Sequence, residues 1–157
     1  MQREHGEVEY RDLGLGELVK FFEESKPIKI GVLSSTAARE DGDSNNAEIG
    51  FLNEFGTSKI PARSWLFATF LSRGRIDEVA ASIKRGFEED IAHGREPKKV
   101  LERFGQSLVA KIQEAFDSEG FGEWEPNAPS TQEKKGRNSP LIDKGWLMKS
   151  VTYEVAQ

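Results

Sequence analysis

Few residues of this chain have the type and spacing that chemistry at a metal would need. The run Asp41-Gly-Asp-Ser-Asn45 begins like a calcium-binding loop. Asn46 stands where such a loop needs glycine at its sixth position, and Leu52 stands where it needs a bidentate glutamate at its twelfth. A solvated loop is therefore the better interpretation, and we expect no metal site.

Residues for acid–base or nucleophilic catalysis show no productive spacing either. His5 and His93 lie far apart, no serine lies in a nucleophile elbow, and the chain has no cysteine. The run Glu88-Glu89-Asp90 falls in a predicted helix, where consecutive residues point in different directions, so a solvated face is the better interpretation. We therefore expect a protein that is not an enzyme and has no cofactor.

The composition indicates a single globular domain over residues 1–157. Hydrophobic residues make up 36% and charged residues 31%, which is too apolar for wholesale disorder. No signal peptide or membrane-spanning run is visible, so we expect a soluble protein without a membrane partner. The net charge of −5 argues against non-specific nucleic-acid binding, and we expect no sequence-specific nucleic-acid partner. Residues 1–60 carry 12 acidic and 7 basic side chains and residues 126–157 carry 3 and 5, a polarity that suits head-to-tail contacts.

Hydrophobic periodicity predicts an α+β fold in which a small, mainly antiparallel sheet packs against two long helices. Alternating apolar residues predict strands at about 28–34, 47–54 and 150–156. Apolar stripes at helical spacing predict helices at about 75–93 and 97–118. The apolar faces of these two helices need a partner, and we expect them to cover the sheet.

Shorter elements complete this prediction. Short helices are expected at about 14–25, at about 129–135 and at about 144–149, the last with Asp143 as its cap. Residues 36–46 offer almost no apolar surface to bury, which predicts a mobile loop.

Three stretches together resemble a known family. Residues 47–57 (AEIGFLNEFGT), followed by 60–66 (IPARSWL), are similar to the EFG–IPAR signature of tailed-bacteriophage virion morphogenesis proteins, the neck and tail-completion proteins of Mu-like and lambda-like phages and prophages. Residues 124–126 (WEP) resemble a second element of that family, and 140–153 resemble its closing element. The order and spacing agree, so the resemblance spans roughly residues 28–156.

The chain departs from the family pattern at three positions. Lys144 stands where the family usually has Thr or Ser, Ser64 where it often has Pro, and Asn127 where it favours Leu. The family is not catalytic, so none of these departures removes a catalytic group.

The resemblance implies a structural virion assembly protein at the phage neck or tail end. Its role would be head–tail joining or tail completion through subunit contacts, in a virion assembled in the bacterial host cytoplasm. Its partners would be other neck and tail proteins and further copies of itself in a homo-oligomeric ring. The alternative from another class is a small non-viral bacterial protein-binding adaptor module.

Candidate interface residues gather at the signature turn and in the turn-rich aromatic segments. Gly56 and Pro61 shape the turn, and Glu54 and Arg63 flank it and are placed to pair across it. We expect this corner to present aromatic side chains to a partner, because tryptophan is enriched at interface hot spots; the alternative is that these rings cap a thin core. The candidate residues are Glu54, Phe55, Arg63, Trp65, Leu66, Trp124 and Trp146.

Overall fold

The computed structural model describes residue 23 and residues 26–39, 44–71 and 75–156. The helix expected at 14–25 lies outside the described residues except for residue 23, and so do the first three residues of the calcium-like run, 41–43. The elements in chain order are β1 (Ile28–Val32), α2 (Asn46–Phe55), α3 (Phe67–Leu71), α4 (Arg75–Ala92), α5 (Pro97–Asp117), α6 (Pro129–Lys135), α7 (Trp146–Ser150) and β2 (Val151–Val155). The predicted α+β class is confirmed.

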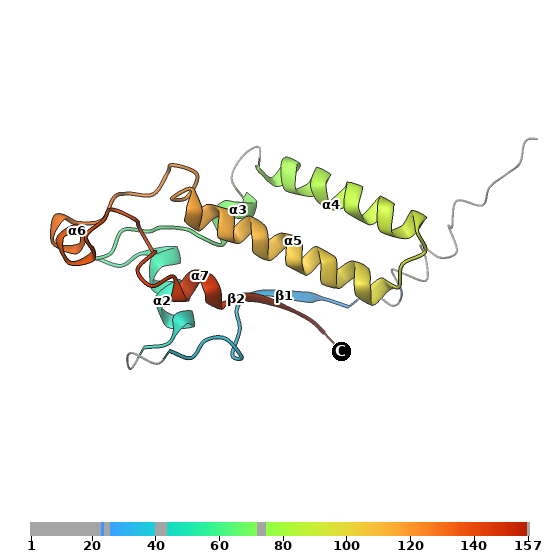
Figure 1. Cartoon of the computed structure of the whole chain (residues 1–157), viewed down its shortest axis with the longest axis horizontal. Helices are drawn as coiled ribbons and strands as arrows, with labels where there is room; N and C mark the ends of the chain where they lie inside the picture. The colour runs from blue at the N-terminus through green and yellow to red at the C-terminus, as the bar shows by residue number, and fades with distance from the viewer. Residues whose placement is uncertain (1–22, 24–25, 40–43, 72–74, 157) are drawn as a thin grey trace, which may run out of the picture.

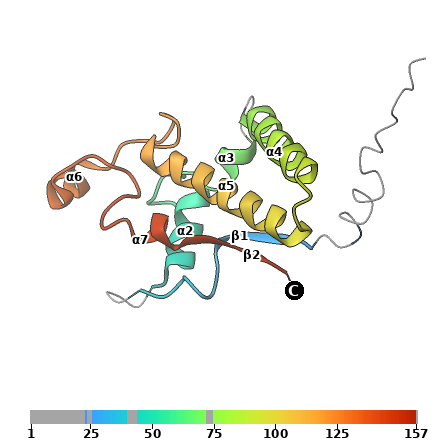
Figure 2. The same ribbon diagram turned by 45° about the vertical axis from the view of Figure 1, so that its right-hand side comes forward.

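The sheet joins the first and last described elements of the chain. β1 and β2 pair antiparallel, with Ile28 opposite Val155 and Val32 opposite Val151, which confirms the first and last predicted strands. Helix α5 runs along the sheet, and Figures 1 and 2 both show it above the two strands. Gly105 of α5 allows this close packing, because a Cβ atom there would overlap the ring of Tyr153 on β2.

Helix α4 does not cover the sheet, contrary to the prediction. It packs on α3 and on α5, and Figure 1 shows it on the side of α5 away from the strands. Two strands about 5 Å apart form a sheet hardly wider than one helix of about 10 Å diameter. α5 therefore occupies the face that the prediction assigned to both helices.

The join between α4 and α5 contains a buried carboxylate. Gly94, shortly after the end of α4, turns the chain with a φ of 62°. Asp90 is buried and forms ion pairs with Arg95, at 2.8 Å, and with Arg103. The expectation of a solvated acidic face is therefore wrong at Asp90, because Arg95 reaches it from the turn and Arg103 reaches it from α5.

The strand predicted at 47–54 is wrong, because these residues form helix α2. A capping box starts the helix: the side chain of Asn45 accepts a hydrogen bond from the backbone N–H of Glu48 at 2.9 Å, and the Glu48 carboxylate accepts one from the N–H of Asn45 at 3.1 Å. The sheet consequently has two strands and not three.

The C-terminal helices α6 and α7 lie where the sequence predicted them, but the predicted cap of α7 is not formed. α6 has the predicted bounds and ends at Gly136 in the left-handed conformation. α7 begins at Trp146 after a left-handed Gly145 and has no side-chain cap. The expected cap by Asp143 is therefore wrong; its backbone carbonyl instead accepts a hydrogen bond from Arg137.

The described parts of the 36–46 segment are hydrogen-bonded to the rest of the fold. The Thr36 hydroxyl donates to the carbonyl of Ser150 at 2.6 Å, and the N–H of Asn46 donates to the carbonyl of Ala37 at 2.7 Å. Mobility of this loop stays a prediction.

The core lies where α5, α7, β2 and the turn before α3 meet. Phe116 of α5 is fully buried, with its ring centroid 5.7 Å from that of Trp65 and 5.8 Å from that of Trp124. Ile112, Leu147 and Val151 complete the buried cluster.

Candidate protein–protein interface

Helix α2 buries its polar and small residues and exposes its aromatic ones. Asn46, Gly50 and Glu54, four residues apart, form the buried face. Phe51 and Phe55, on the outer face, are 64% and 58% exposed. A helix at the surface of a globular protein normally does the opposite and turns its apolar stripe toward the core.

The packing of α2 on Trp65 explains which side faces inward. The Trp65 indole N–H donates to the carbonyl of Gly50 at 2.9 Å. A Cβ atom on Gly50 would lie 3.0 Å from the Trp65 ring and 3.2 Å from Leu147, so a larger residue would hold the helix away. Glycine at this position fixes the rotation of α2 and thereby leaves the phenylalanines outside.

Four exposed apolar side chains form a group that we call the aromatic patch. The ring centroids of Phe51 and Phe55 are 4.9 Å apart, and those of Phe55 and Phe67 are 6.0 Å apart. Phe67, the first residue of α3, is 47% exposed, and Leu52 is 42% exposed. The aromatic patch consists of Phe51, Leu52, Phe55 and Phe67. Exposed apolar groups of this kind mark interaction sites more often than scattered single residues do.

The Glu54 carboxylate fixes α3 against α2. It accepts hydrogen bonds from the backbone N–H groups of Trp65 and Leu66 at 2.8 Å each, and from that of Phe67 at 3.0 Å. It also accepts one from the Ser64 hydroxyl at 2.5 Å. A carboxylate at this place satisfies the free N–H groups at the start of a helix. The two halves of the aromatic patch are therefore joined through one buried side chain.

Arg63 does not pair with Glu54, so the predicted ion pair across the turn is wrong. Its guanidinium donates to the carbonyls of Glu125 at 2.9 Å and of Pro126 at 3.0 Å. Burial lowers the pKa of Arg63 from its ordinary value, an effect that Glu125 partly offsets. Arg63 thus ties the turn to the segment after α5.

Gly56 has the backbone role that the sequence indicated, although it follows a helix and not a strand. Its φ is 71°, and an added Cβ atom would lie 2.7 Å from the backbone nitrogen of Ala62. The N–H of Arg63 donates to the carbonyl of Asn53 at 2.7 Å, which closes the turn. Only glycine fits this combination of dihedral angle and close approach.

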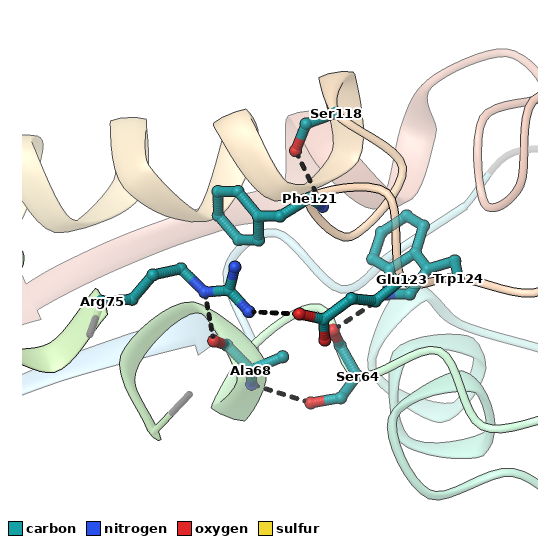
Figure 3. A network of polar contacts seen from close by, with 7 residues as sticks. All are labelled: Ser64, Ala68, Arg75, Ser118, Phe121, Glu123 and Trp124. Carbon is teal, nitrogen blue, oxygen red and sulfur yellow. Dashed lines mark hydrogen bonds and ion pairs between the residues drawn. The ribbon is translucent and has the colours of Figure 1, made fainter. Parts of the chain in front are cut away.

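The loop after α5 holds α3 from its other side, as Figure 3 shows. The Trp124 indole N–H donates to the carbonyl of Ser64 at 3.1 Å. The Ser64 hydroxyl accepts from the N–H of Ala68 at 2.9 Å.

Arg75 adds a second connection in the same network. Its guanidinium donates to the carbonyl of Ala68 at 3.3 Å, pairs with Glu123 at 3.1 Å and lies 4.1 Å from the centre of the Phe121 ring. The short helix α3, which carries Phe67, is thus fixed from both sides.

The seven predicted interface residues lie at different depths. Trp65 is 4% exposed and belongs to the core, so the expectation that the turn presents it at the surface is wrong. Glu54 and Arg63 are also buried, Leu66, Trp124 and Trp146 are half-buried, and Phe55 is exposed.

The prediction missed Phe51, Leu52 and Phe67. The missed signal was the Asn45-x-x-Glu48 capping pattern, which places residues 46–55 in a helix and Phe51 one turn before Phe55.

Within the described ranges, no three histidine or carboxylate side chains gather as a metal site would require. None of the helices in the described part of the chain combines the length and the hydropathy needed to cross a bilayer. Comparison of the chain with protein-family models, curated proteins and solved structures finds no match.

Proposed function

We propose that this protein is a non-catalytic structural subunit that binds other protein subunits through the aromatic patch, at the neck or tail end of a tailed-bacteriophage virion. The observation that supports binding is the inverted burial of α2, which exposes Phe51 and Phe55 while Glu54 is buried. The virion setting comes from the resemblance of residues 47–66, 124–126 and 140–153 to neck and tail-completion proteins.

The energetics of the patch favour binding. Fully burying a side chain of this size is worth about 1.5–3 kcal/mol. The four side chains are 42–64% exposed, so covering them recovers roughly half of that for each, about 3–6 kcal/mol in total before the cost of association. The hydrogen bonds of Glu54 already hold α2 and α3 together. Little conformational entropy is therefore lost when a partner covers the patch.

A double substitution, Phe51→Gln with Phe55→Gln, tests the binding role. Glutamine keeps the helix propensity of α2 and removes the exposed rings. In sedimentation velocity over a concentration series, we expect the wild-type protein to form an oligomer and the double variant to stay monomeric. The melting temperature of the double variant should hardly change, because surface substitutions usually alter stability by within about 0.5 kcal/mol.

Two control variants make the result interpretable. Trp65→Ala, in the core, should cost about 3–5 kcal/mol of unfolding free energy. Lys84→Gln, on the exposed face of α4, should change neither association nor stability. A double variant that associates normally but unfolds easily would show that the phenylalanines serve stability and would refute the binding role.

The virion role has its own test. Deleting the gene from the phage or prophage that carries it should give particles with unjoined heads and tails or with incomplete tails, seen by electron microscopy. Normal particles would refute this role. A chain that remains monomeric and binds a partner protein outside any virion would support the adaptor alternative instead.

A further inference from the structure

A pocket of about 210 Å³ lies beside the buried face of α2, between that helix, the segment after α5 and the start of α7. Four basic side chains and one acidic side chain are among its lining residues. These are Arg39, Arg63, Lys135, Lys144 and Asp143. Its lining is therefore cationic, although the whole chain is acidic.

Asn127, one of the lining residues of this pocket, has a buried hydrogen-bond donor without an acceptor among the described residues. The residue is 8% exposed, and its Nδ2 atom has no hydrogen-bond partner in the described part of the chain. Its backbone is fixed, because its N–H donates to the side chain of Asn138 at 2.9 Å and its carbonyl accepts from Gln132 at 2.6 Å. Buried donors without a partner are rare in native proteins, and one that belongs to a lining residue of a pocket points to an acceptor that binds beside it.

Three of these basic side chains, Arg63, Lys135 and Lys144, are held in place by uncharged groups. Arg63 donates to the carbonyls of the segment after α5, and Lys135 donates to the carbonyl of Ser139 at 2.6 Å. The Lys144 ammonium lies 4.5 Å from the centre of the Trp146 ring. Burial, with smaller effects from Arg137 and Arg63, lowers the pKa of Lys135 against the opposing effect of Asp143. An added negative charge would therefore be stabilised in this pocket.

The size of the pocket limits what it holds. Its volume far exceeds the roughly 30 Å³ of one water but falls short of the roughly 300 Å³ at which pockets for drug-sized ligands begin. The basic and amide groups share the lining with the apolar side chains of Ile49 and Leu147. This combination suits a carboxylate on a short aliphatic stem.

We propose that this pocket binds the carboxylate of an acidic side chain from a neighbouring subunit, with Asn127 Nδ2 and Lys135 as donors. The proposal rests on the proposed function, since it supplies a polar contact for the same assembly. A second copy of the chain offers suitable groups, because residues 1–60 carry 12 acidic and 7 basic side chains. Inorganic phosphate shares the anionic chemistry and is distinguished in the test.

The three tryptophans provide the measurement. The indole N–H groups of Trp65 and Trp124 donate to backbone carbonyls outside the pocket, whereas Trp146 lines it. In nitrogen–proton correlation spectra we titrate the protein with N-acetylglutamate amide, with N-acetylglutamine amide and with inorganic phosphate at matched ionic strength. We expect the glutamate compound alone to shift the Trp146 signal in a saturable way, while the other two indole signals stay in place.

Other patterns in this titration overturn the proposal. Equal shifts with the glutamine compound would show that the carboxylate is not recognised. Stronger binding of phosphate would show a site for inorganic anions and not for a protein side chain. An unmoved Trp146 signal would show that the pocket binds neither.

Variants then test the named donors. Lys135→Gln should weaken binding of the glutamate compound about 10- to 100-fold, as expected for the loss of a charged hydrogen bond. Lys134→Gln, at the exposed neighbouring position, should leave binding unchanged. Asn127→Leu should abolish binding and yet keep or raise the melting temperature, because it removes an unpaired buried donor. Normal binding by Asn127→Leu would overturn the proposal.

The experiments can refute the carboxylate pocket and the binding role of the aromatic patch independently of each other. If the titration gives no Trp146 shift while the Phe51 and Phe55 substitutions still dissociate the oligomer, only the carboxylate pocket is wrong. If the pocket binds the glutamate compound while those substitutions leave association unchanged, the binding role of the aromatic patch is wrong.

Discussion

Replacing Glu54 by alanine should be one of the most destabilising single changes in this chain. The carboxylate is 6% exposed and accepts four hydrogen bonds, three of them from the backbone at the start of α3. Alanine would leave these donors without an acceptor and would open a cavity between α2 and α3. Glutamine would fill the same space but would direct an amide NH₂ group toward N–H groups that also need an acceptor.

The size of the effect follows from the burial of the donors. A hydrogen bond to a charged group contributes about 1.5–3 kcal/mol, so four counted in full would give about 6–12 kcal/mol, comparable to the whole stability of a domain. Only the bond to the N–H of Trp65 is fully buried, and the other donors are part-buried and can reach water after a small rearrangement. We therefore expect a loss of about 3–5 kcal/mol for Glu54→Ala and about 1.5–3 kcal/mol for Glu54→Gln.

Urea unfolding followed by tryptophan fluorescence measures these losses, and an unchanged m-value would show that the comparison is sound. Glu48→Gln is the matched control, because Glu48 lies on the same helix, is exposed and caps the N–H of one residue. It should cost no more than about 1 kcal/mol. If Glu54→Gln and Glu48→Gln cost the same, the idea that one buried carboxylate organises the corner is refuted.

Two further predictions concern the turn and the sheet. Gly56→Ala should lower the free energy of unfolding by about 2–4 kcal/mol, because it combines a φ of 71° with a backbone clash; a urea midpoint equal to that of the unchanged protein would show that the turn relaxes freely. Deleting residues 151–157 should abolish cooperative thermal unfolding, because β1 loses its paired strand. Val151→Ala alone should lower the free energy of unfolding by about 1.5–3 kcal/mol. The control Glu154→Ala, at an exposed position of the same strand, should lower it by less than about 0.5 kcal/mol. A truncated chain that melts cooperatively near the full-length temperature would contradict the role assigned to β2.

The long helices and the two strands could be predicted from the sequence because their signals are local. An apolar stripe at helical spacing, Pro97 at the first helical position and Gly94 in the preceding turn fix α5 and its start within the segment itself. Gly136, in the left-handed conformation, ends α6 in the same way. Alternation of apolar residues fixed β1 and β2, since one face of each strand is buried under α5.

The sequence also indicated the positive φ of Gly56, because a glycine just before a Pro-containing turn is typical of a backbone conformation that other residues rarely adopt. It did not reveal what the turn supports. Glu54 and Arg63 have opposite charges and stand close in the chain, which favours pairing, yet each binds backbone groups that the fold brings to it. Closeness of opposite charges in the sequence therefore did not predict the hydrogen-bond partners of Glu54 and Arg63.

Tertiary structure alone decided which aromatic residues are buried. Trp65 and Phe55 are both large aromatic residues at the same corner, and nothing in their local sequence separates them. Trp65 is buried because Phe116 of α5 and Leu147 of α7, both distant in the chain, pack around it. Phe55 lies against the rings of Phe51 and Phe67, which are themselves exposed, and stays 58% exposed. Sequence periodicity determines where a helix forms and which residues share a face. Which face is covered depends on elements from elsewhere in the chain, because burial is a property of the packed neighbours.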